Sequence, residues 1–404
     1  MSTSLLYHGW SIRGYQYRRT RYENGTIVFD VEPSEKKVCC SRCGTQDVVR
    51  QGTVTRRWRT LPIGGRSVFV QLDVPRVRCS QCKVTRQIKI DFADERVHHC
   101  KAFTRYVLEL SQHMSIQDVA DHLGVGWDVV KGIVKGDLKA RYRHIRLKDL
   151  KQIAVDEISI GKGHRYITLV LDLESGAVVF IGNGKGADAL EPFWARLIAS
   201  RAKIDAVASD MSAAYLLAIS ENLPKATHVL DRFHVMKLYN EKLADLRRDV
   251  QRTVETVEHK ELIKGTRWLL AKNEEDLDPD RNEYQRLQDA LRINQPLATA
   301  YYLKEDLRQF WERSSKRSGE RFLDSWIAQA ESSGIKMLIA FAKTLRLHRR
   351  MLLNWYDYPI STGPLEGTNN KIKTMKRQAY GYRDQEFFRL KIYSLHEKKH
   401  AKAG

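Results

Sequence analysis

The chain has 404 residues and carries 69 Lys plus Arg against 49 Asp plus Glu, a formal net charge of +20. This length exceeds a single compact core, so we expect two to four domains. Such a positive charge favours a polyanionic partner, nucleic acid first, through counterion release and long-range attraction. The sequence has neither an apolar signal region nor a stretch long enough to span a membrane, which argues against secreted and membrane proteins and predicts a cytoplasmic one.

After an N-terminal segment, residues 1–35, we expect a zinc ribbon over residues 36–95. Four of the six cysteines form two CxxC pairs, Cys40 with Cys43 and Cys79 with Cys82. Each pair is typical of a tight turn that points two thiolates at one ion, and two such turns around a β-rich segment predict a closed, structural zinc site. Free cysteines are the alternative.

The β-rich segment alternates along residues 67–77, after a turn at Gly64 and Gly65. Cys39 could compete with Cys40, but only Cys40 has the CxxC spacing, and Cys39 and Cys100 need no role. Between residues 36 and 89 there are thirteen Lys or Arg against two Asp. The ribbon therefore stays basic even with a four-thiolate zinc site, and we expect it to contact DNA phosphates.

Residues 100–145 predict a helix-turn-helix. Residues 115–118, SIQD, form a capping box that opens a short helix, and Gly124 ends it. A third helix begins near Trp127 and carries the apolar residues Val129, Val130, Ile133 and Val134. In a helix-turn-helix this helix enters the major groove, and an ordinary helical hairpin is the alternative. The DNA-facing side chains would be Trp127, Asp128, Lys131 and Lys135.

A second folding pattern begins at residue 151. The run KQIAVDEISI predicts a buried strand with one acid, Asp156, inside it. Two more strands, at residues 165–174 and 177–182, a helix at 188–201 that should bury Ile198, and alternating strands and helices follow. This order of strands and helices is that of a ribonuclease H-like fold, an α/β mixed sheet flanked by helices.

This topology makes the first and fourth strands neighbours, so Asp156 and Asp210 should face one another. Two carboxylates at such a distance repel unless divalent cations share them, and oxygen ligands favour Mg²⁺ or Mn²⁺. Glu157 points to the opposite face of the strand. A structural ion pair or a cap is the other interpretation of Asp156.

A third ligand is predicted far downstream, where residues 361–371 read STGPLEGTNNK. Pro364 marks a first helical turn that also carries Glu366, and Asn370 and Lys373 share the face of Glu366. A basic helix able to hold a phosphate backbone follows; its cations are Lys371, Lys373, Lys376 and Arg377. A glutamate that only complements the helix dipole is the alternative.

The runs VDEISIGKGHRYITLVLDLESGAVVF, SDMSAAY, DRFHVMK and STGPLEGTNNKIKTMKRQAYGYR resemble the DDE transposases of bacterial insertion sequences, specifically the ISL-three family. The resemblance covers nearly the whole chain, including the zinc ribbon and the helix-turn-helix. It implies that Asp156, Asp210 and Glu366 are the DDE triad, and that Asp231 and His234 form the family's acid-x-x-His element. The catalytic domain would comprise residues 150–250 and 356–395, interrupted by a helical insertion at 251–355.

The resemblance implies metal-dependent cleavage at terminal inverted repeats and transfer of the freed 3′-OH to target DNA. We expect double-stranded DNA as the partner and a dimer or larger assembly, since two ends must be brought together. Two alternatives stay open: a metal-dependent nuclease or resolvase on the same fold, and a non-catalytic regulator. A related class of transposases uses an insertion-domain tryptophan at flipped DNA ends, which singles out Trp268 and Trp311 here, although a core role is the ordinary one.

Overall fold

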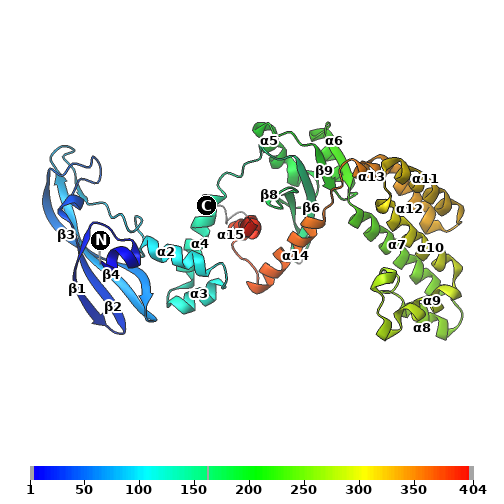
Figure 1. Ribbon diagram of the computed structural model, residues 1–404, viewed down its shortest axis with the longest axis horizontal. Helices are drawn as coiled ribbons and strands as arrows, with labels where there is room; N and C mark the ends of the chain where they lie inside the picture. Colours follow the sequence, from blue (N-terminus) through cyan, green and yellow to red (C-terminus); the bar gives the residue numbers. More distant parts are fainter. Residues whose placement is uncertain (1–3, 162, 400–404) are drawn as a thin grey trace. The chain divides into compact units, whose positions relative to one another are not determined.

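The computed structural model describes residues 4–161 and 163–399, and the chain divides into two compact units, Met1–Arg143 and His144–Gly404 (Figure 1). No helix in the described ranges combines the length and apolar character needed to cross a membrane. The first unit is a β-sheet followed by a small helical bundle. The second is a mixed sheet between helices, with a large helical insertion.

The sheet of the first unit has the strand order β1-β2-β4-β3, with β5 paired to β4. Residues from the N-terminal segment form two of its strands, so this segment is part of the ribbon's sheet. The short helix α1 (Leu5–Trp10) precedes it. The strands are β1 (Tyr15–Glu23), β2 (Thr26–Pro33), β3 (Val48–Ile63), β4 (Arg66–Cys79) and β5 (Thr85–Gln87).

The hairpin between β3 and β4 turns at Gly64 and Gly65, whose φ angles are 56° and 76°. Positive φ at both central residues is what a type I′ turn requires, and glycine adopts it without steric cost. Along β4, buried and mostly apolar side chains alternate with partly exposed or exposed ones, with a break at Pro75, as the period of the sequence predicted.

Three helices complete the first unit: α2 (Lys101–Leu110), α3 (Ile116–Leu123) and α4 (Trp127–Arg141). Ser115 caps α3 in a full capping box with Asp118, and Gly124 follows α3 at φ 60°, both as predicted. Of the apolar residues that α4 carries, Val130, Ile133 and Val134 are buried, whereas Val129 is exposed on the first turn.

The second unit is built on a five-stranded sheet in the order β10-β9-β6-β7-β8. Strand β7 pairs antiparallel with β6 on one side and with β8 on the other. Strands β9 and β10 run parallel to β6. This is the predicted ribonuclease H-like topology. The strands are β6 (Gln152–Gly161), β7 (Arg165–Asp172), β8 (Val178–Asn183), β9 (Ala206–Ser209) and β10 (Thr227–Leu230).

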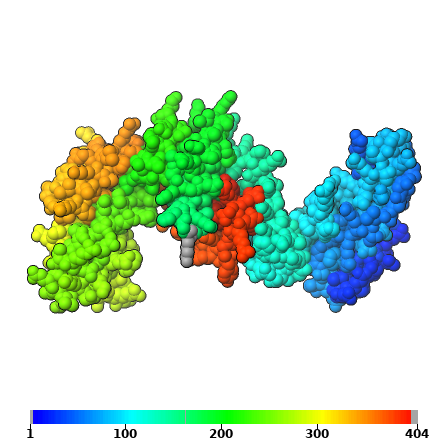
Figure 2. All heavy atoms as spheres, turned by 180° about the vertical axis from the view of Figure 1, so that it is seen from behind, coloured from blue at the N-terminus to red at the C-terminus, as the bar shows by residue number. Residues whose placement is uncertain are grey.

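Helices cover both faces of this sheet. One face packs on α5 (Glu191–Ser200) and α6 (Ala213–Asn222) through Val155 and Phe193, among others. The other packs on α14 (Gly363–Gln378) and α15 (Gln385–Tyr393) through Ala154 and Leu365. In Figure 2 these C-terminal helices, in red, lie against the green sheet residues. Ile198 was predicted to be buried and is wrong: it is 70% exposed, on the outer side of α5.

The insertion follows the long helix α7 (Arg232–Thr253) and packs against it. Buried Tyr239 of α7 donates a hydrogen bond to the carbonyl of Ala300 over 2.7 Å, and buried Trp326 donates to the carbonyl of Leu303 over 2.8 Å. The insertion helices are α8 (Val257–Gly265), α9 (Glu283–Ile293), α10 (Gln295–Arg308), α11 (Lys316–Ser332), α12 (Lys336–Leu347) and α13 (Arg349–Leu353).

Candidate active site and DNA-binding elements

Asp156 lies in the middle of β6 on the face that packs against α14. Its side chain is 14% exposed. The backbone N–H of Glu157 donates to its Oδ1 over 2.8 Å, and Asn369 of α14 donates from Nδ2 to its Oδ2 over 2.9 Å. Burial raises the pKa of Asp156, and the charge of Asp210 adds to this, against the lowering effects of Glu157 N–H, His234 and Asn369.

Asp210 follows the last residue of β9. Because β6 and β9 pair in parallel with Ala154 opposite Ala208, Asp156 and Asp210 come two residues later at the same end of neighbouring strands. The backbone N–H of Ser212 donates to Asp210 Oδ1 over 2.9 Å at the start of α6. The strand order thus places two carboxylates within electrostatic reach of each other, as the topology predicted.

Buried Asp231 and half-buried His234 form a pair at the start of α7. His234 Nδ1 lies 3.0 Å from Asp231 Oδ2, and Nε2 of the same ring lies 4.0 Å from Asp156 Oδ1. The imidazole therefore bridges the acid on β6 and the acid that begins α7. Burial alone would lower the pKa of His234, but the hydrogen bond to Asp231 and the charges of Asp156, Asp231 and Asp210 raise it.

Thr362 holds Asp231 from the loop that precedes α14. Its backbone N–H donates to Asp231 Oδ1 over 3.1 Å, and its hydroxyl donates to Oδ2 over 2.6 Å. Burial raises the pKa of Asp231, but the hydrogen bonds from His234 and Thr362 outweigh it and lower the pKa overall. Asp231 is therefore a buried carboxylate whose charge is satisfied by donors from two distant parts of the chain.

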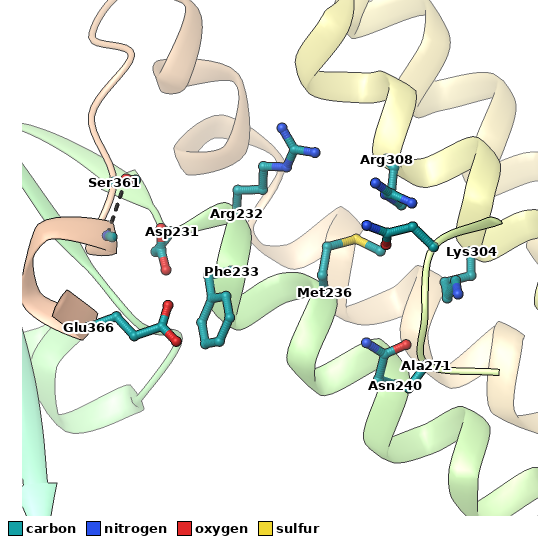
Figure 3. A pocket seen from close by; sticks show the side chains of 12 residues that line it. Asp231, Arg232, Phe233, Met236, Asn240, Ala271, Lys304, Arg308, Ser361 and Glu366 are labelled. Carbon is teal, nitrogen blue, oxygen red and sulfur yellow. Dashed lines mark hydrogen bonds between the residues drawn. The ribbon is translucent and has the colours of Figure 1, made fainter. Parts of the chain in front are cut away.

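Glu366 lies in the first turn of α14 and is exposed. With Asp231, Arg232 and Phe233 it lines a cavity of about 400 Å³, and Figure 3 shows its carboxylate beside Phe233. Across residues 4–161 and 163–399, the one group of three or more Cys, His, Asp or Glu at metal-ligand spacing is the cysteine set of the ribbon. Among the described residues, Asp156 and Asp210 are thus within electrostatic reach of each other, but Asp156, Asp210 and Glu366 do not form a group of three at metal-ligand spacing.

Sequence reasoning missed Asn369 and Thr362. It chose Asn370 for the face of Glu366, but Asn370 is exposed and Asn369 is the buried neighbour that reaches Asp156. Spacing alone does not separate the two, because residues three and four apart both share a face with Glu366. The burial of Leu365 and Ile372 on the sheet side of α14 would have favoured Asn369, which lies four residues after Leu365 and three before Ile372.

The basic residues predicted on α14 divide into two groups. Lys376 donates a hydrogen bond to the carbonyl of Ile160 and so ties α14 to the end of β6. Lys371, Lys373 and Arg377 are exposed.

Glu157 faces away from Asp156, as the period of the strand predicted. It accepts a hydrogen bond from the hydroxyl of Tyr215 on α6 over 3.3 Å. The hydroxyl of Tyr215 also lies 3.1 Å from Thr168 Oγ1 on β7, so Tyr215 links α6 to two strands of the sheet. Burial raises the pKa of Tyr215 to about 12, with added repulsion from Glu157 and Asp210. These contacts lie on the face of β6 opposite Asp156.

The four cysteines of the two CxxC pairs converge in the first unit: their sulfur atoms lie within 4.8 Å of one another. In each pair a backbone N–H approaches the first sulfur, from Arg42 to Cys40 Sγ at 3.4 Å and from Cys82 to Cys79 Sγ at 3.2 Å. Backbone hydrogen bonds from Cys43 and Arg42 lower the pKa of Cys40 to about 6.

The neighbouring thiols, Cys43 first, raise the pKa of Cys82 to about 12. A closed set of four sulfurs that disfavour joint ionisation fits a structural Zn²⁺, which would neutralise them together. Cys39 and Cys100 lie outside the set.

The helix-turn-helix is joined to the sheet by Arg59 of β3. Its buried guanidinium donates to the carbonyl of Leu123, at the end of α3, over 2.8 Å, and lies 5.2 Å from the ring of Phe69 and 5.9 Å from that of Phe103. On α4 the ring of Trp127 is 42% exposed, and the ammonium of Lys131 lies 5.0 Å from its centroid. Trp127 and Asp128 are exposed on the first turn, and Lys131 and Lys135 are half-buried.

Comparison with known proteins gives matches to three family profiles, which together span most of the chain. A profile described as a transposase matches residues 153–392, and one described as the zinc-finger of transposase IS204/IS1001/IS1096/IS1165 matches residues 36–82. A third, the helix-turn-helix domain of transposase family ISL3, matches residues 88–136.

Two curated relatives are similar over most of their length. The chain is 34% identical over 390 residues, 95% of each chain, to the transposase for insertion sequence element IS1001 of Bordetella parapertussis. It is 29% identical over 372 residues, 86% of this chain and 83% of the relative, to the transposase for IS1557 of Mycobacterium tuberculosis. Among solved structures, the Drosophila P element transposase strand transfer complex matches 67% of this chain and 81% of that chain at 10% identity, with a TM-score of 0.37.

Proposed function

The chain belongs to the ISL3 family of transposases, and we propose that it cleaves the ends of its insertion sequence by metal-dependent hydrolysis and joins the freed 3′-OH to target DNA. Asp156, Asp210 and Glu366 form the catalytic triad in this proposal. The observation that carries it is the pairing of β6 with β9, which puts Asp156 and Asp210 at the same end of adjacent strands. A DNA-binding regulator would have no need of that arrangement.

The donor set at this end of the sheet fits Mg²⁺ or Mn²⁺. Both ligands are carboxylates, and burial together with Asp210 raises the pKa of Asp156, so the pair lacks a positive charge that a divalent cation would provide. When bound, two such cations would activate a water molecule and neutralise the charge that develops on the leaving oxygen. Glu366 would join Asp156 and Asp210 as the third metal ligand when DNA binds beside α14.

The surrounding residues hold the acids in place. Asn369 and the N–H of Glu157 occupy one acceptor site on each oxygen of Asp156, which fixes the orientation of the carboxylate. His234, held by Asp231, would orient a phosphate oxygen of the cleaved strand. Water attacks the phosphodiester in line, and the 3′-OH it frees then attacks a target phosphodiester, so no covalent protein intermediate and no ATP are required.

The recognition elements are proposed from the first unit. The zinc ribbon, residues 36–95, and the helix-turn-helix, residues 100–145, would bind terminal inverted repeats in double-stranded DNA. Both ends must be held for transfer, so we infer a dimer or larger assembly acting at the nucleoid in the cytoplasm. Base and phosphate contacts would come from Trp127, Lys131 and Lys135 of the first unit. Further contacts would come from α14 of the second unit, through Asn370, Lys371, Lys373, Lys376 and Arg377.

The test uses the full chain with duplexes copied from both ends of the element that carries its gene, in Mg²⁺ or Mn²⁺. Cleavage and strand transfer by the wild type, and their loss in Asp156→Asn, Asp210→Asn and Glu366→Gln variants that still bind the duplexes, are expected. Cutting without joining would identify a nuclease or resolvase, and binding without either reaction a regulator. Full transfer by the three variants would refute the triad.

A further inference from the structure

A cavity of about 400 Å³ adjoins the candidate active site, within the second unit. Three parts of the chain line it: the start of α7, the residues that lead into α14, and the insertion. Glu366 and Asp231 lie at one end, and Lys304 and Arg308 of α10 at the other (Figure 3). A cavity of this volume is within the range of small-ligand sites. The triad mechanism uses only the Glu366 end of it.

One side of the cavity is a stripe of α7. Phe233, Met236 and Asn240 follow one another at spacings of three and four residues, so they share a helix face. Phe233 is 48% exposed, and its ring lies edge-to-face with that of His234 at a centroid distance of 5.8 Å. The Oδ1 atom of Asn240 is buried and has no hydrogen-bond partner within the described ranges. A buried acceptor without a donor is costly, so a ligand that supplies one is favoured.

The cations around the cavity differ in what they already bind. The Lys304 ammonium is held by the carbonyls of Leu270 and Lys272, each at 2.8 Å, and by Glu305. Arg308 pairs with Glu305 and Glu275. Arg232 instead lies over the ring of Trp311 at 5.5 Å, and no carboxylate pairs with it in residues 4–161 and 163–399. The guanidinium of Arg232 is therefore the cationic group that is available to pair with a phosphate.

We propose that this cavity binds one unpaired nucleotide of the DNA strand next to the bond that is cleaved. The inference rests on the proposed transposase activity and identifies a base-binding subsite for it. The base stacks on Phe233, an exocyclic amino group donates to Asn240 Oδ1, and the phosphate pairs with Arg232. Aromatic stacking, one amide and one free guanidinium are the groups by which proteins hold a base that has left the helix.

The position of Glu366 explains why the site would serve the reaction. A nucleotide drawn into the cavity brings its adjoining phosphodiester to the Glu366 and Asp231 end, the end nearest the acids. A free phosphate ion in the cavity could pair with Arg232 but would be repelled by the carboxylates of Glu366 and Asp231. A whole nucleotide also contacts Phe233 and Asn240, so it suits the cavity better than an anion alone.

The test uses full-length protein and end duplexes in which 2-aminopurine replaces each base in turn beside the cleavage position. Without added Mg²⁺ or Mn²⁺, which prevents cleavage but leaves the zinc of the ribbon in place, binding of the wild type should raise the fluorescence of one such base. Phe233→Ala and Asn240→Leu should abolish the rise, and Phe233→Ala should weaken binding about 5- to 150-fold, the range for loss of one stacked base. Tyr284→Ala, which removes an equally exposed aromatic ring outside the cavity, should change neither.

An abasic nucleotide at the responding position makes the test specific. The Phe233→Ala effect on binding should vanish on that duplex, because the stacked base is gone. An equal loss on abasic and intact duplexes, or no fluorescence change at any position while the DNA is bound, would overturn the proposal. Asp156→Asn should keep the fluorescence rise and lose cleavage. A rise without any cleavage by the wild type would therefore refute the proposed activity and leave the subsite standing.

Discussion

Asn369 donates a hydrogen bond to Asp156 over 2.9 Å, and so links α14 to the centre of β6. This contact fixes the carboxylate on the face where Asp210 follows β9. Asn369 is not an acid and acts through its hydrogen bond to Asp156, so it is a positioning residue. Its loss should be felt through the orientation and charge of Asp156.

Replacing Asn369 by Leu should lower the rate of end cleavage about 10- to 100-fold, the usual effect of removing a partner of a metal ligand. The Mg²⁺ concentration for half-maximal rate should rise as well, because Asp156 would be free to rotate. Asn370→Leu is the matched comparison for the metal requirement: its amide is exposed and does not reach Asp156, so the substitution should leave the Mg²⁺ concentration for half-maximal rate unchanged even where it weakens DNA binding. An unchanged metal requirement in Asn369→Leu would rule out the positioning role.

Thr362→Val should destabilise the second unit by about 1–3 kcal/mol. The substitution keeps the shape but removes the hydroxyl that donates to buried Asp231 Oδ2, which leaves part of a charged acceptor unsatisfied. Urea unfolding of wild type and variant gives the difference. Thr344→Val is a suitable control, because that hydroxyl donates to a carbonyl on an exposed helix surface. Equal losses from the two substitutions would contradict a special role for Thr362.

The stability of the second unit should depend on pH through His234. The pKa of His234 is raised in the folded chain above the value of about 6.5 for an unfolded one. Protonated His234 therefore stabilises the fold fully below pH of about 6.5, and this contribution is lost as pH rises through the raised pKa. The difference in urea midpoint between wild type and His234→Gln should be largest near pH 5.5 and shrink toward pH 9. A difference in urea midpoint that grows with pH would contradict this prediction.

Removal of zinc should unfold part of the first unit only. Cys79→Ser with Cys82→Ser should abolish stoichiometric zinc, measured by elemental analysis, and reduce protection of β3 and β4 in hydrogen exchange. The second unit should keep its protection, because it has its own sheet and cores. Cys39→Ser should retain zinc, since Cys39 lies outside the sulfur set. Undiminished zinc in the double variant would remove the site.

Lys131→Ala should weaken binding to end duplexes and reduce the slope of log K against log salt by about one, the effect of one lost phosphate contact. Trp127→Ala should instead alter the preference between end and unrelated sequences if the ring meets base edges. Fluorescence anisotropy across salt concentrations separates the two outcomes. An unchanged slope in Lys131→Ala would exclude a phosphate contact at that position.

The fold was predictable where it follows from the local residue pattern or from the order of strands and helices along the chain. Buried β-branched runs and the order of strands and helices predicted the mixed sheet, and hence the adjacency of Asp156 and Asp210. The CxxC spacing predicted the sulfur set, and the capping box at Ser115 predicted the start of α3. These features depend on periodicity and short-range geometry.

What could not be predicted depends on contacts between distant segments. The choice of Asn369 over Asn370 follows from how α14 rotates on the sheet, and the role of Thr362 from the loop that meets Asp231. Val129 and Ile198 look apolar enough to be buried, yet their helices turn them outward. The cavity beside Glu366 needs α7, α10 and the start of α14 together, so no single motif contains it.

The contacts around Asp231 and Asp156 join residues more than a hundred positions apart, with 131 between Thr362 and Asp231 and 213 between Asn369 and Asp156. Such long-range contacts form late, because a large loop must first be closed. During synthesis the sheet strands and the whole insertion leave the ribosome before α14 does. Asp156 and Asp231 thus lack their partners Asn369 and Thr362 until α14 is made, so a nascent chain that ends before α14 carries no assembled site beside the genome that encodes it.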